Sequence, residues 1–359
     1  MKARVIAYYL PQFHPIPEND TYWGRGFTEW TNVARGRRLF PGHKQPHIPA
    51  DLGFYDLRLP EVREQQAELA REAGIEAFCY YEYWFGPGKR LMERPFDEVV
   101  ATGKPDFPFC LCWANHSWYK KLWDPKQPGK DKLLIEQQYL GEEDYALHFR
   151  TLLPAFKDKR YVRVNGKLFY IIYDALHFDD VRSFMTIWRR LAAENGLGDF
   201  YFVATDFNSE HRKELLDMGF DATHNVDHLN IYHVSNVFAK GMLTIGRKYL
   251  GFPMIYPYKK AAQFMLNDDC RQRNVIPVIV PNWDHTPRSG SQGLVMTNPH
   301  PMYFKQLAER ALDMVKDKPE DERIIMVKSW NEWGEGNYME PDLEHGHGYI
   351  DALAEALGK

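Results

Sequence analysis

Short apolar runs recur along the chain and give the strongest constraint on its fold. They cover residues 5–10, 75–81, 107–112, 168–173, 201–204, 220–223, 275–280 and 324–327. Runs of this length with little polar alternation are typical of strands buried on both faces, as in a parallel sheet. Most are followed by Trp, Tyr, His, Asn, Asp or Glu, so polar and aromatic side chains are expected to gather at one end of the sheet.

Amphipathic segments lie between these runs. Residues 60–73, 181–194, 210–218 and 302–315 carry apolar side chains at three- and four-residue spacing, which predicts helices. Eight buried strands alternating with helices predict a (β/α)8 TIM barrel with its site on the C-terminal face. A doubly wound open sheet is the alternative, but it needs a glycine turn after the first strand, and residues 10–14 contain no glycine.

Long loop regions fall between the predicted barrel elements. They span residues 15–58, 119–142, 227–258 and 284–300. We interpret them as βα insertions that cover the active-site face, so residues 1–359 are expected to form a single catalytic domain. Residues 15–58 are rich in Pro, Gly, His and aromatics without helical periodicity, and loops of that length are usually functional.

Composition and charge exclude several classes of partner. The formal net charge of -4 with mixed signs gives no basic stripe for nucleic acid. No apolar stretch approaches the ~20 residues of a membrane span. The start of the chain has no charged region followed by a separate apolar region and cleavage site, so a cytoplasmic location is expected. Aromatic residues make up 15% of the chain, which suits the binding of an oligosaccharide or polysaccharide.

Cofactor and metal motifs do not stand out. There is no P-loop and no glycine fingerprint for a nucleotide. His43 with His47, and His345 with His347 and Asp342, have loose metal-like spacing but lack a firmly placed further ligand. Four cysteines without paired spacing are expected to be reduced core residues. We therefore expect neither a cofactor nor a metal.

Two carboxylates follow the last apolar run. Glu332 and Glu335 lie in a stretch with two tryptophans, where a turn permitted by Gly334 and Gly336 could bring both to the mouth of the barrel. Two carboxylates with different pKa values are the usual equipment for breaking an acetal, so both are candidate catalytic residues. The alternative is that they cap a helix or pair with an arginine.

Residues after the predicted strands and in the first long loop are candidates for sugar binding. They are Tyr9, Gln12, His14, Trp23, Glu29, Trp30, Tyr83, Trp84, Trp113, Asn115, His116, Asn282, Trp283, Asp284, Trp330, Asn331 and Trp333. The polar members could bind sugar hydroxyls, and the aromatic members could stack on sugar rings. Because a single Trp is more often a core residue, about half of the aromatic members are expected to face the cleft.

Five motifs together carry a resemblance to a known family. They are residues 8–15 (YYLPQFHP), 23–30 (WGRGFTEW), 42–46 (GHKQP), 52–58 (LGFYDLR) and 330–336 (WNEWGEG). The chain resembles the WbsX-type proteins, which are similar to glycoside hydrolase family 99. That family is often labelled a glycosyltransferase of lipopolysaccharide or capsule biosynthesis, and its barrel resembles those of endo-α-mannosidases. The likeness covers essentially the whole chain.

The resemblance implies roles for the two glutamates. The mannosidases carry a Glu-Trp-His-Glu motif, and residues 332–335 match it except at Gly334. The implied mechanism is retaining, without an enzyme nucleophile: Glu332 deprotonates the 2-hydroxyl of the sugar, which attacks C1 and gives a 1,2-anhydro sugar. Glu335 protonates the leaving oxygen and later deprotonates the incoming water or acceptor. This chemistry requires a 2-hydroxyl trans to the leaving group, as in α-mannosides and α-rhamnosides.

Two other functions remain open. The family label suggests a sugar-nucleotide-dependent glycosyltransferase of O-antigen or capsule biosynthesis, although no pyrophosphate clamp or metal-binding Asp-x-Asp is evident. The other alternative is a non-catalytic glycan-binding barrel. Such a protein would keep the tryptophans but could dispense with one glutamate.

Overall fold

A parallel sheet forms the centre of the molecule. The computed structural model describes residues 2–120, 132–226, 246–247, 249 and 251–359. The strands are β1 (Arg4–Tyr9), β2 (Ala77–Trp84), β4 (Phe109–Trp113), β8 (Lys167–Ile172), β9 (Phe200–Asp206), β10 (Ala222–Asn225), β12 (Val275–Ile276), β13 (Val278–Ile279) and β15 (Ile324–Val327). Their order is β12-β10-β9-β8-β4-β2-β1-β15-β13, and each neighbouring pair is parallel.

The two ends of this order belong to one interrupted strand. Pro277 separates β12 from β13, because proline has no N–H to contribute to a sheet. β12 pairs with β10 while β13 pairs with β15, so the interrupted strand joins both ends of the sheet. The carbonyl of Pro277 still accepts a hydrogen bond from the amide of Met326 at 3.0 Å. The sheet is therefore a (β/α)8 barrel, as the sequence predicts.

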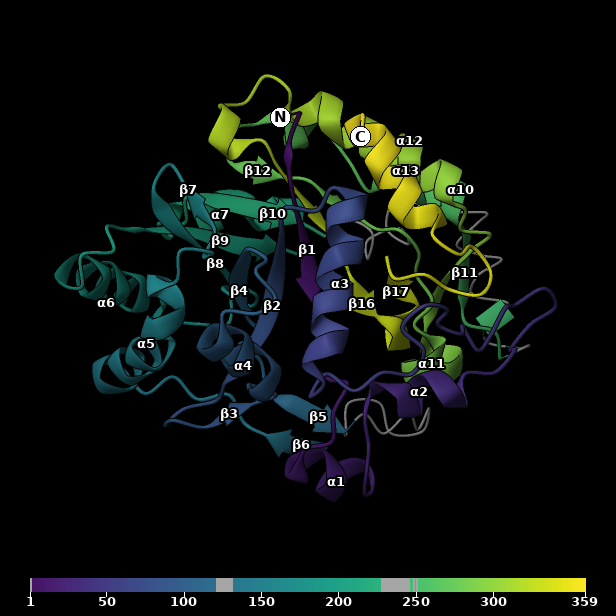
Figure 1. Ribbon diagram of the computed structural model, residues 1–359, viewed down its shortest axis with the longest axis horizontal. Coiled ribbons are helices and arrows are strands. Elements are labelled where there is room, and N and C mark those ends of the chain that lie inside the picture. The colour runs from purple at the N-terminus through teal and green to yellow at the C-terminus, as the bar shows by residue number, and fades with distance from the viewer. Residues whose placement is uncertain (1, 121–131, 227–245, 248, 250) are drawn as a thin grey trace.

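Helices surround the barrel (Figure 1). They are α3 (Pro60–Ala73), α4 (Arg94–Thr102), α5 (Glu142–Lys157), α6 (Val181–Glu194), α7 (Arg212–Asp217), α10 (Tyr258–Phe264), α12 (Pro301–Val315) and α13 (Gly348–Leu357). The helices predicted at 60–73 and 181–194 are confirmed to the residue. That predicted at 302–315 starts one residue earlier, and that at 210–218 is divided into a 3-10 turn, η1 (Ser209–His211), and α7.

The first long loop contains two short helices that its lack of periodicity did not predict. They are α1 (Pro17–Trp23) and α2 (Glu29–Arg35). Helices of seven residues are too short to show a periodic pattern, but α2 has a local start signal. The Oγ1 atom of Thr31 accepts a hydrogen bond from the amide of Thr28 at 3.3 Å. The expectation of a loop without helices was therefore wrong for this region.

Smaller elements lie in the segments that connect the barrel strands and helices. They are β3 (Arg90–Leu91), β5 (Trp118–Lys120), β6 (Lys132–Ile135), β7 (Arg163–Val164), β11 (Met254–Pro257), α11 (Thr286–Ser289), β14 (Leu294–Thr297), β16 (Asn331–Glu332) and β17 (Asn337–Tyr338), with 3-10 turns η3 (Asp268–Arg271), η4 (Gly290–Gln292), η5 (Glu320–Glu322) and η6 (Trp333–Glu335). Most of the loop predicted at 227–258, and residues 121–131 of that at 119–142, lie outside the described residues.

The cysteines are core residues, as the sequence predicts, and the two ends of the chain are neighbours. All four cysteines are free and buried. The N- and C-terminal ends lie side by side (Figure 1), where Lys2 Nζ donates to the carbonyl of Ala356 at 3.2 Å. None of the helices in the described ranges has the length and apolar character needed to cross a bilayer.

Candidate active site

Glu332 and Glu335 lie in a tight turn beyond the C-terminal end of β15. β16 pairs with β17 in an antiparallel hairpin, and η6 forms the turn between them. Gly336 has φ 53°, a left-handed conformation that favours glycine, and a Cβ there would lie 2.7 Å from Asp284 Cβ. Both carboxylates line a cavity of about 570 Å³. The turn therefore presents the two predicted catalytic groups to the same space.

The two carboxylates have different electrostatic surroundings. Glu335 accepts a hydrogen bond from Arg288 Nη1, and its Oε1 lies 3.3 Å from His285 Nε2. Glu332 has weaker contacts, with Oε1 3.6 Å from Arg288 Nη1 and Oε2 3.6 Å from Lys328 Nζ. Burial alone would raise both pKa values. For Glu332, burial and the charge of Glu335 dominate and its pKa is raised. For Glu335, Arg288 and His285 outweigh burial and hold its pKa well below the usual range.

Lys328 is a buried cation at the base of the cavity, directly after β15. Its Nζ donates to Tyr81 Oη at 3.2 Å and lies 5.8 Å from the ring centroids of both Tyr8 and Tyr81. Burial lowers the pKa of the lysine, but Glu332, Tyr173 and Glu335 together outweigh burial and the pKa is raised. Lys328 therefore stays charged beside Glu332.

Several predicted binding residues do line cavities here. Gln12, Tyr83, His116 and Trp283 line the cavity that holds the two glutamates. An adjoining cavity of about 810 Å³ is lined by Trp23, Glu29 and Asn115, together with Phe27, Trp118 and Tyr139. Gln12, His116, His285 and Arg288 line both cavities, so the two spaces meet at Arg288. The side chain of Asn115 already makes hydrogen bonds within the protein, since its Nδ2 donates to Tyr139 Oη and to the carbonyl of Asp174.

Four predicted binding aromatics are instead core residues between the sheet and the helices. Tyr9 Oη donates to Gln66 Oε1 of α3 at 2.6 Å, and Trp84 Nε1 donates to Asp144 Oδ2 of α5 at 3.2 Å. Trp113 and Trp330 are 1% and 0% exposed. Successive side chains of a strand point to opposite faces, so about half of those on a barrel strand point outward. A strand apolar on both faces does not reveal which half that is.

Four further candidates support the site from behind the cavity. Trp30 Nε1 donates to the carbonyl of Tyr55 at 2.7 Å, and Asn331 Oδ1 accepts from the amide of Leu10 at 2.7 Å. Trp333 stacks on Tyr338 with ring centroids 3.7 Å apart. His14 is 2% exposed, and burial lowers its pKa. These residues hold loops in place, and the expectation of sugar contacts from them does not match their positions.

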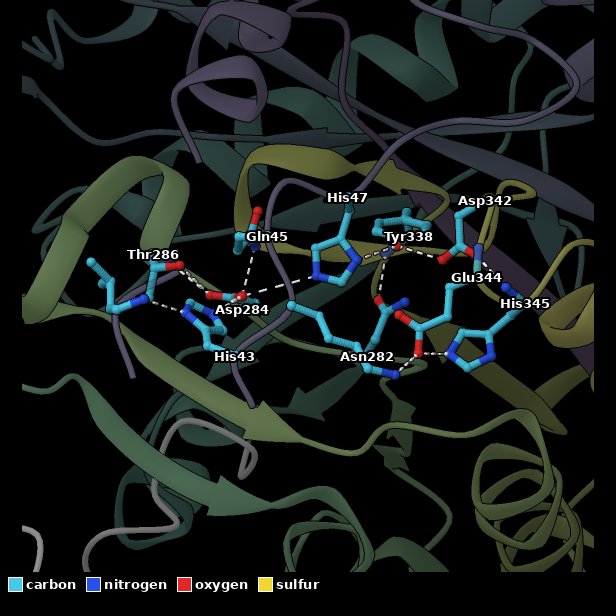
Figure 2. Close-up of polar contacts among 12 residues, drawn as sticks. His43, Gln45, His47, Asn282, Asp284, Thr286, Tyr338, Asp342, Glu344 and His345 are labelled. Atoms are coloured by element: carbon cyan, nitrogen blue, oxygen red, sulfur yellow. Dashed lines mark hydrogen bonds and ion pairs between the residues drawn. The ribbon is translucent and has the colours of Figure 1, made fainter. Parts of the chain in front are cut away.

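Asn282 and Asp284 belong to a polar network (Figure 2) that contacts the turn carrying Glu332 and Glu335. Asp284 Oδ2 accepts from His43 Nε2 at 2.8 Å and from Gln45 Nε2 at 2.6 Å, while Oδ1 accepts from the amide and hydroxyl of Thr286. His43 Nδ1 accepts from the amide of Leu39, so its Nε2 carries the proton. The amide of Asp284 donates to the carbonyl of Glu335 at 2.7 Å. The network thus anchors the turn to the 42–46 motif.

The site contains basic side chains that the sequence-based reasoning missed. Arg288, Lys328 and His285 surround the two glutamates, and none was among the candidates. Lys328 directly follows the last apolar run, which is a signal that could have identified it. Arg288 and His285 lie in a loop region without periodicity, and only the fold brings them to the glutamates.

Comparison with known proteins identifies the family. The sequence profile described as "Glycosyltransferase WbsX" matches residues 5–353. The chain belongs to the WbsX family. Two relatives called "Uncharacterized protein WxcX", from two strains of Xanthomonas campestris pv. campestris, are each 36% identical to it over 99% of this chain. The WbsX chain covers 50% of each of these relatives, so it spans about half their length.

Solved structures with mannosidase-type barrels are similar to this WbsX chain. The GH99 endo-alpha-mannosidase from Bacteroides thetaiotaomicron superposes with a TM-score of 0.57 at 14% identity, covering 99% of this chain and 96% of the other. A "Glycoside hydrolase-like protein" gives a TM-score of 0.60 at 15% identity over 99% and 93% of the two chains. A human "Glycoprotein endo-alpha-1,2-mannosidase-like protein" is 22% identical over 86% of this chain and 60% of its own length. The structural likeness establishes the fold.

Glu340 contacts Trp333 of the turn that carries Glu332 and Glu335, and it is expected to make the stability of the protein depend on pH. This buried carboxyl accepts from Trp333 Nε1 and Gln66 Nε2, both at 2.6 Å, and from Tyr55 Oη at 2.9 Å. Burial outweighs these donors and raises its pKa to about 7. A raised pKa in the folded state favours folding below the unfolded-state value near 4.5, and this contribution is lost as pH rises to 7.

We therefore expect the free energy of unfolding to decrease between pH 5 and pH 7.5 by up to about 3 kcal/mol from this residue. Glu340→Gln removes the titrating group, so its unfolding free energy should vary less with pH over that range. Urea unfolding of both proteins at several pH values measures the difference. Equal slopes would exclude Glu340 as the titrating group.

Proposed function

We propose that this chain cleaves or transfers at a glycosidic bond of a mannoside- or rhamnoside-like glycan, with retention of configuration. The observation that carries the proposal is the pair of buried carboxylates at one cavity, with pKa values shifted in opposite directions. Two carboxyl groups that face one cavity can supply one base and one acid for acetal chemistry. In the substrate-free protein the pKa shifts are the reverse of the roles proposed below, so Glu335 has to lose its contact with Arg288 before it can give a proton. Tyr83 and Trp283 line the same cavity and offer surfaces for a sugar ring. The names of the mannosidase relatives support a glycan as substrate.

The proposed first step uses the substrate's own 2-hydroxyl. Glu332 takes the proton of that hydroxyl, O2 forms a bond to C1, and the bond from C1 to the leaving oxygen breaks. Glu335 gives its proton to the leaving oxygen, so a 1,2-anhydro sugar and a neutral alcohol result. The raised pKa of Glu332 makes it a stronger base than an exposed carboxylate would be.

The second step reverses the proton transfers. Glu335, now ionised, takes a proton from water or from an acceptor hydroxyl, whose oxygen bonds to C1 while the bond from C1 to O2 breaks. Glu332 returns its proton to O2. The product keeps the configuration of the substrate because C1 is attacked twice from opposite sides.

The route predicts dependence on the 2-hydroxyl. A 2-deoxy or 2-fluoro analogue of a cleaved α-mannoside or α-rhamnoside should be inert, because neither can form the 1,2-anhydro sugar. The analogue should still bind in the cavity, which isothermal titration calorimetry measures. Product formation is followed by proton NMR, which also reports whether the anomeric configuration is retained. Efficient cleavage of the 2-deoxy analogue would exclude the anhydro route.

A sugar-nucleotide glycosyltransferase is the second candidate, favoured by the description of the family. Its donor needs free positive charge for a pyrophosphate. Arg288 and Lys328, the cations of the catalytic cavity among the described residues, are each close to carboxylates. Calorimetric titration with GDP-mannose and dTDP-rhamnose separates the two functions. Specific, tight binding of either would favour the transferase over the proposal made here.

A further inference from the structure

Gly334 replaces the histidine of the mannosidase motif, and another residue's side chain fills the vacant position. A Cβ atom at residue 334 would lie 1.5 Å from Glu29 Oε1 and 2.6 Å from Glu29 Cδ. Real Cβ atoms essentially never lie that close to a non-bonded atom, so any side chain at 334 would displace Glu29. The carboxylate of Glu29 therefore occupies the position where residue 334 would otherwise carry its side chain.

Glu29 is held there from the first long loop. It is the first residue of α2, its amide donates to the carbonyl of Gln12 at 2.9 Å, and its side chain is 1% exposed. Its Oε1 accepts from Arg288 Nε at 2.7 Å. α2 packs against both α11, which carries Arg288, and η6, which carries Gly334. Glu29, Arg288 and Gly334 therefore form one cluster, although they come from three separate segments.

Arg288 connects this cluster to the catalytic pair. Its Nε faces Glu29, while its Nη1 donates to Glu335 and lies 3.6 Å from Glu332 Oε1. One guanidinium thus contacts three carboxylates. Arginine suits this position because its planar fork presents several donors in fixed directions.

The charges around Glu335 explain why Arg288 matters for its protonation. Arg288 and Lys328 are the cations near it, His285 lies 3.3 Å away, and Glu332 and Glu29 supply negative charge. Tyr173 from the end of β8 also faces the pair. With Arg288 bound, Glu335 stays ionised, yet the proposed first step requires it to give a proton. Arg288 must therefore leave Glu335 before that step.

We propose that Glu29 anchors Arg288 in the space left by Gly334, and that Arg288 thereby controls which of the two catalytic glutamates carries the proton. Glu29 retains the guanidinium when Glu335 releases it for catalysis. Glu29 and Arg288 are positioning residues in this scheme. The inference rests on the proposed function for its catalytic meaning, but both of its tests use the substrate-free protein.

A double-mutant cycle tests the shared space. Gly334→Ala alone should lower the melting temperature strongly, because the new Cβ displaces a buried ion-paired carboxylate. In a Glu29→Ala background the same substitution should lower the melting temperature by less than half as much, since the space is then free. Gly346→Ala is the control, because nothing lies within 4 Å of the position that a Cβ atom of residue 346 would take. The change in melting temperature that it causes should be equal in both backgrounds. Equal losses for Gly334→Ala in both backgrounds would overturn the shared-space claim.

Carboxyl titration tests the control of protonation, which a merely structural role would not change. Protein labelled with carbon-13 at the glutamate side-chain carboxyl is titrated by NMR, and the Glu332 and Glu335 signals are assigned by their loss in Glu332→Gln and Glu335→Gln. Arg288→Gln should move the Glu335 titration to higher pH. Glu29→Gln keeps the volume of Glu29 but removes its charge, so it should move the Glu332 titration to lower pH.

Two further variants make this test decisive. Arg288→Lys keeps the charge without the fork and should give a smaller upward shift of Glu335, which covers the case in which Arg288→Gln does not fold. Glu355→Gln is the control, since that exposed glutamate of α13 pairs with Lys305 and lines neither cavity, and it should shift neither signal. An unchanged Glu335 titration in both Arg288 variants would overturn the inference while leaving the proposed glycosidase function untouched. Normal shifts in a protein that cleaves no glycan would instead count against the proposed function alone.

Discussion

Glu335→Gln is expected to lower kcat by about 10³-fold on a glycan that the unaltered protein cleaves, because the variant has no proton to give to the leaving oxygen. Glutamine keeps the size of the side chain and still accepts a hydrogen bond from Arg288. Binding should therefore persist, within a few-fold, when measured by calorimetry with the same glycan. A large loss in kcat with retained binding identifies an interaction made in the transition state.

Two comparisons give this experiment its controls. Glu355→Gln changes an exposed glutamate of α13 that pairs with Lys305, and its kcat should match that of the unaltered protein. A substrate with a 4-nitrophenyl leaving group needs little protonation, so Glu335→Gln should lose much less activity on it than on a disaccharide. If the losses on both substrates are the same, Glu335 is not the proton donor. If kcat is unchanged on the disaccharide, the assignment of Glu335 is wrong.

The barrel can be predicted from the sequence because the patterns that indicate its strands and helices are local. Each buried strand appears as an apolar run, and α3 has a proline in its first turn and Gly74 in a left-handed conformation directly after its end. Even the division of the seventh strand follows from Pro277, which cannot donate to a ladder. The short helices α1 and α2 escaped prediction because they are held by contacts with other segments rather than by a periodic pattern.

The sequence identifies only part of the site, because the site residues come from segments that are far apart in the sequence. Glu332 and Glu335 follow a strand and share a motif, so they could be found together. Arg288 and Glu29 are distant from them in sequence, and only the closed barrel brings the four side chains to one point. Among Glu29, Arg288 and Gly334, only Gly334 stood out in the sequence, because it departs from the mannosidase motif. Its meaning depends on Glu29, which the sequence placed only as a possible sugar contact.

Asp284 shows how a predicted binding residue can serve the site without facing it. Each of its carboxylate oxygens accepts two hydrogen bonds, Oδ2 from His43 and Gln45 and Oδ1 from the amide and hydroxyl of Thr286. Its own amide holds the carbonyl of Glu335. The Asp284 side chain is 6% exposed, so water cannot replace a lost partner.

Asp284→Asn is therefore expected to lower the free energy of unfolding by about 3–5 kcal/mol at neutral pH. Whichever way the new amide is turned, its NH₂ group faces a donor that cannot become an acceptor, either His43 Nε2 or the backbone amide of Thr286. Urea unfolding measures the loss. Asp313→Asn is the matched control: that aspartate pairs with Arg271 and Lys316 at the surface, and its replacement should change stability little.

The pH dependence of the loss in unfolding free energy shows whether the charge of Asp284, and not only its packing, stabilises the protein. Burial raises the pKa of Asp284, but His43, Gln45 and Thr286 outweigh it and hold the pKa below its ordinary value of 3.8. A lowered pKa in the folded state stabilises the protein above the unfolded-state value, and this contribution is lost as pH falls through the folded-state value. The difference between the unaltered protein and Asp284→Asn should thus be full at neutral pH and shrink in acid. A difference that stays constant down to the acid limit of the folded state would mean that the carboxylate charge contributes nothing, and that the network holds the turn of Glu332 and Glu335 by shape alone.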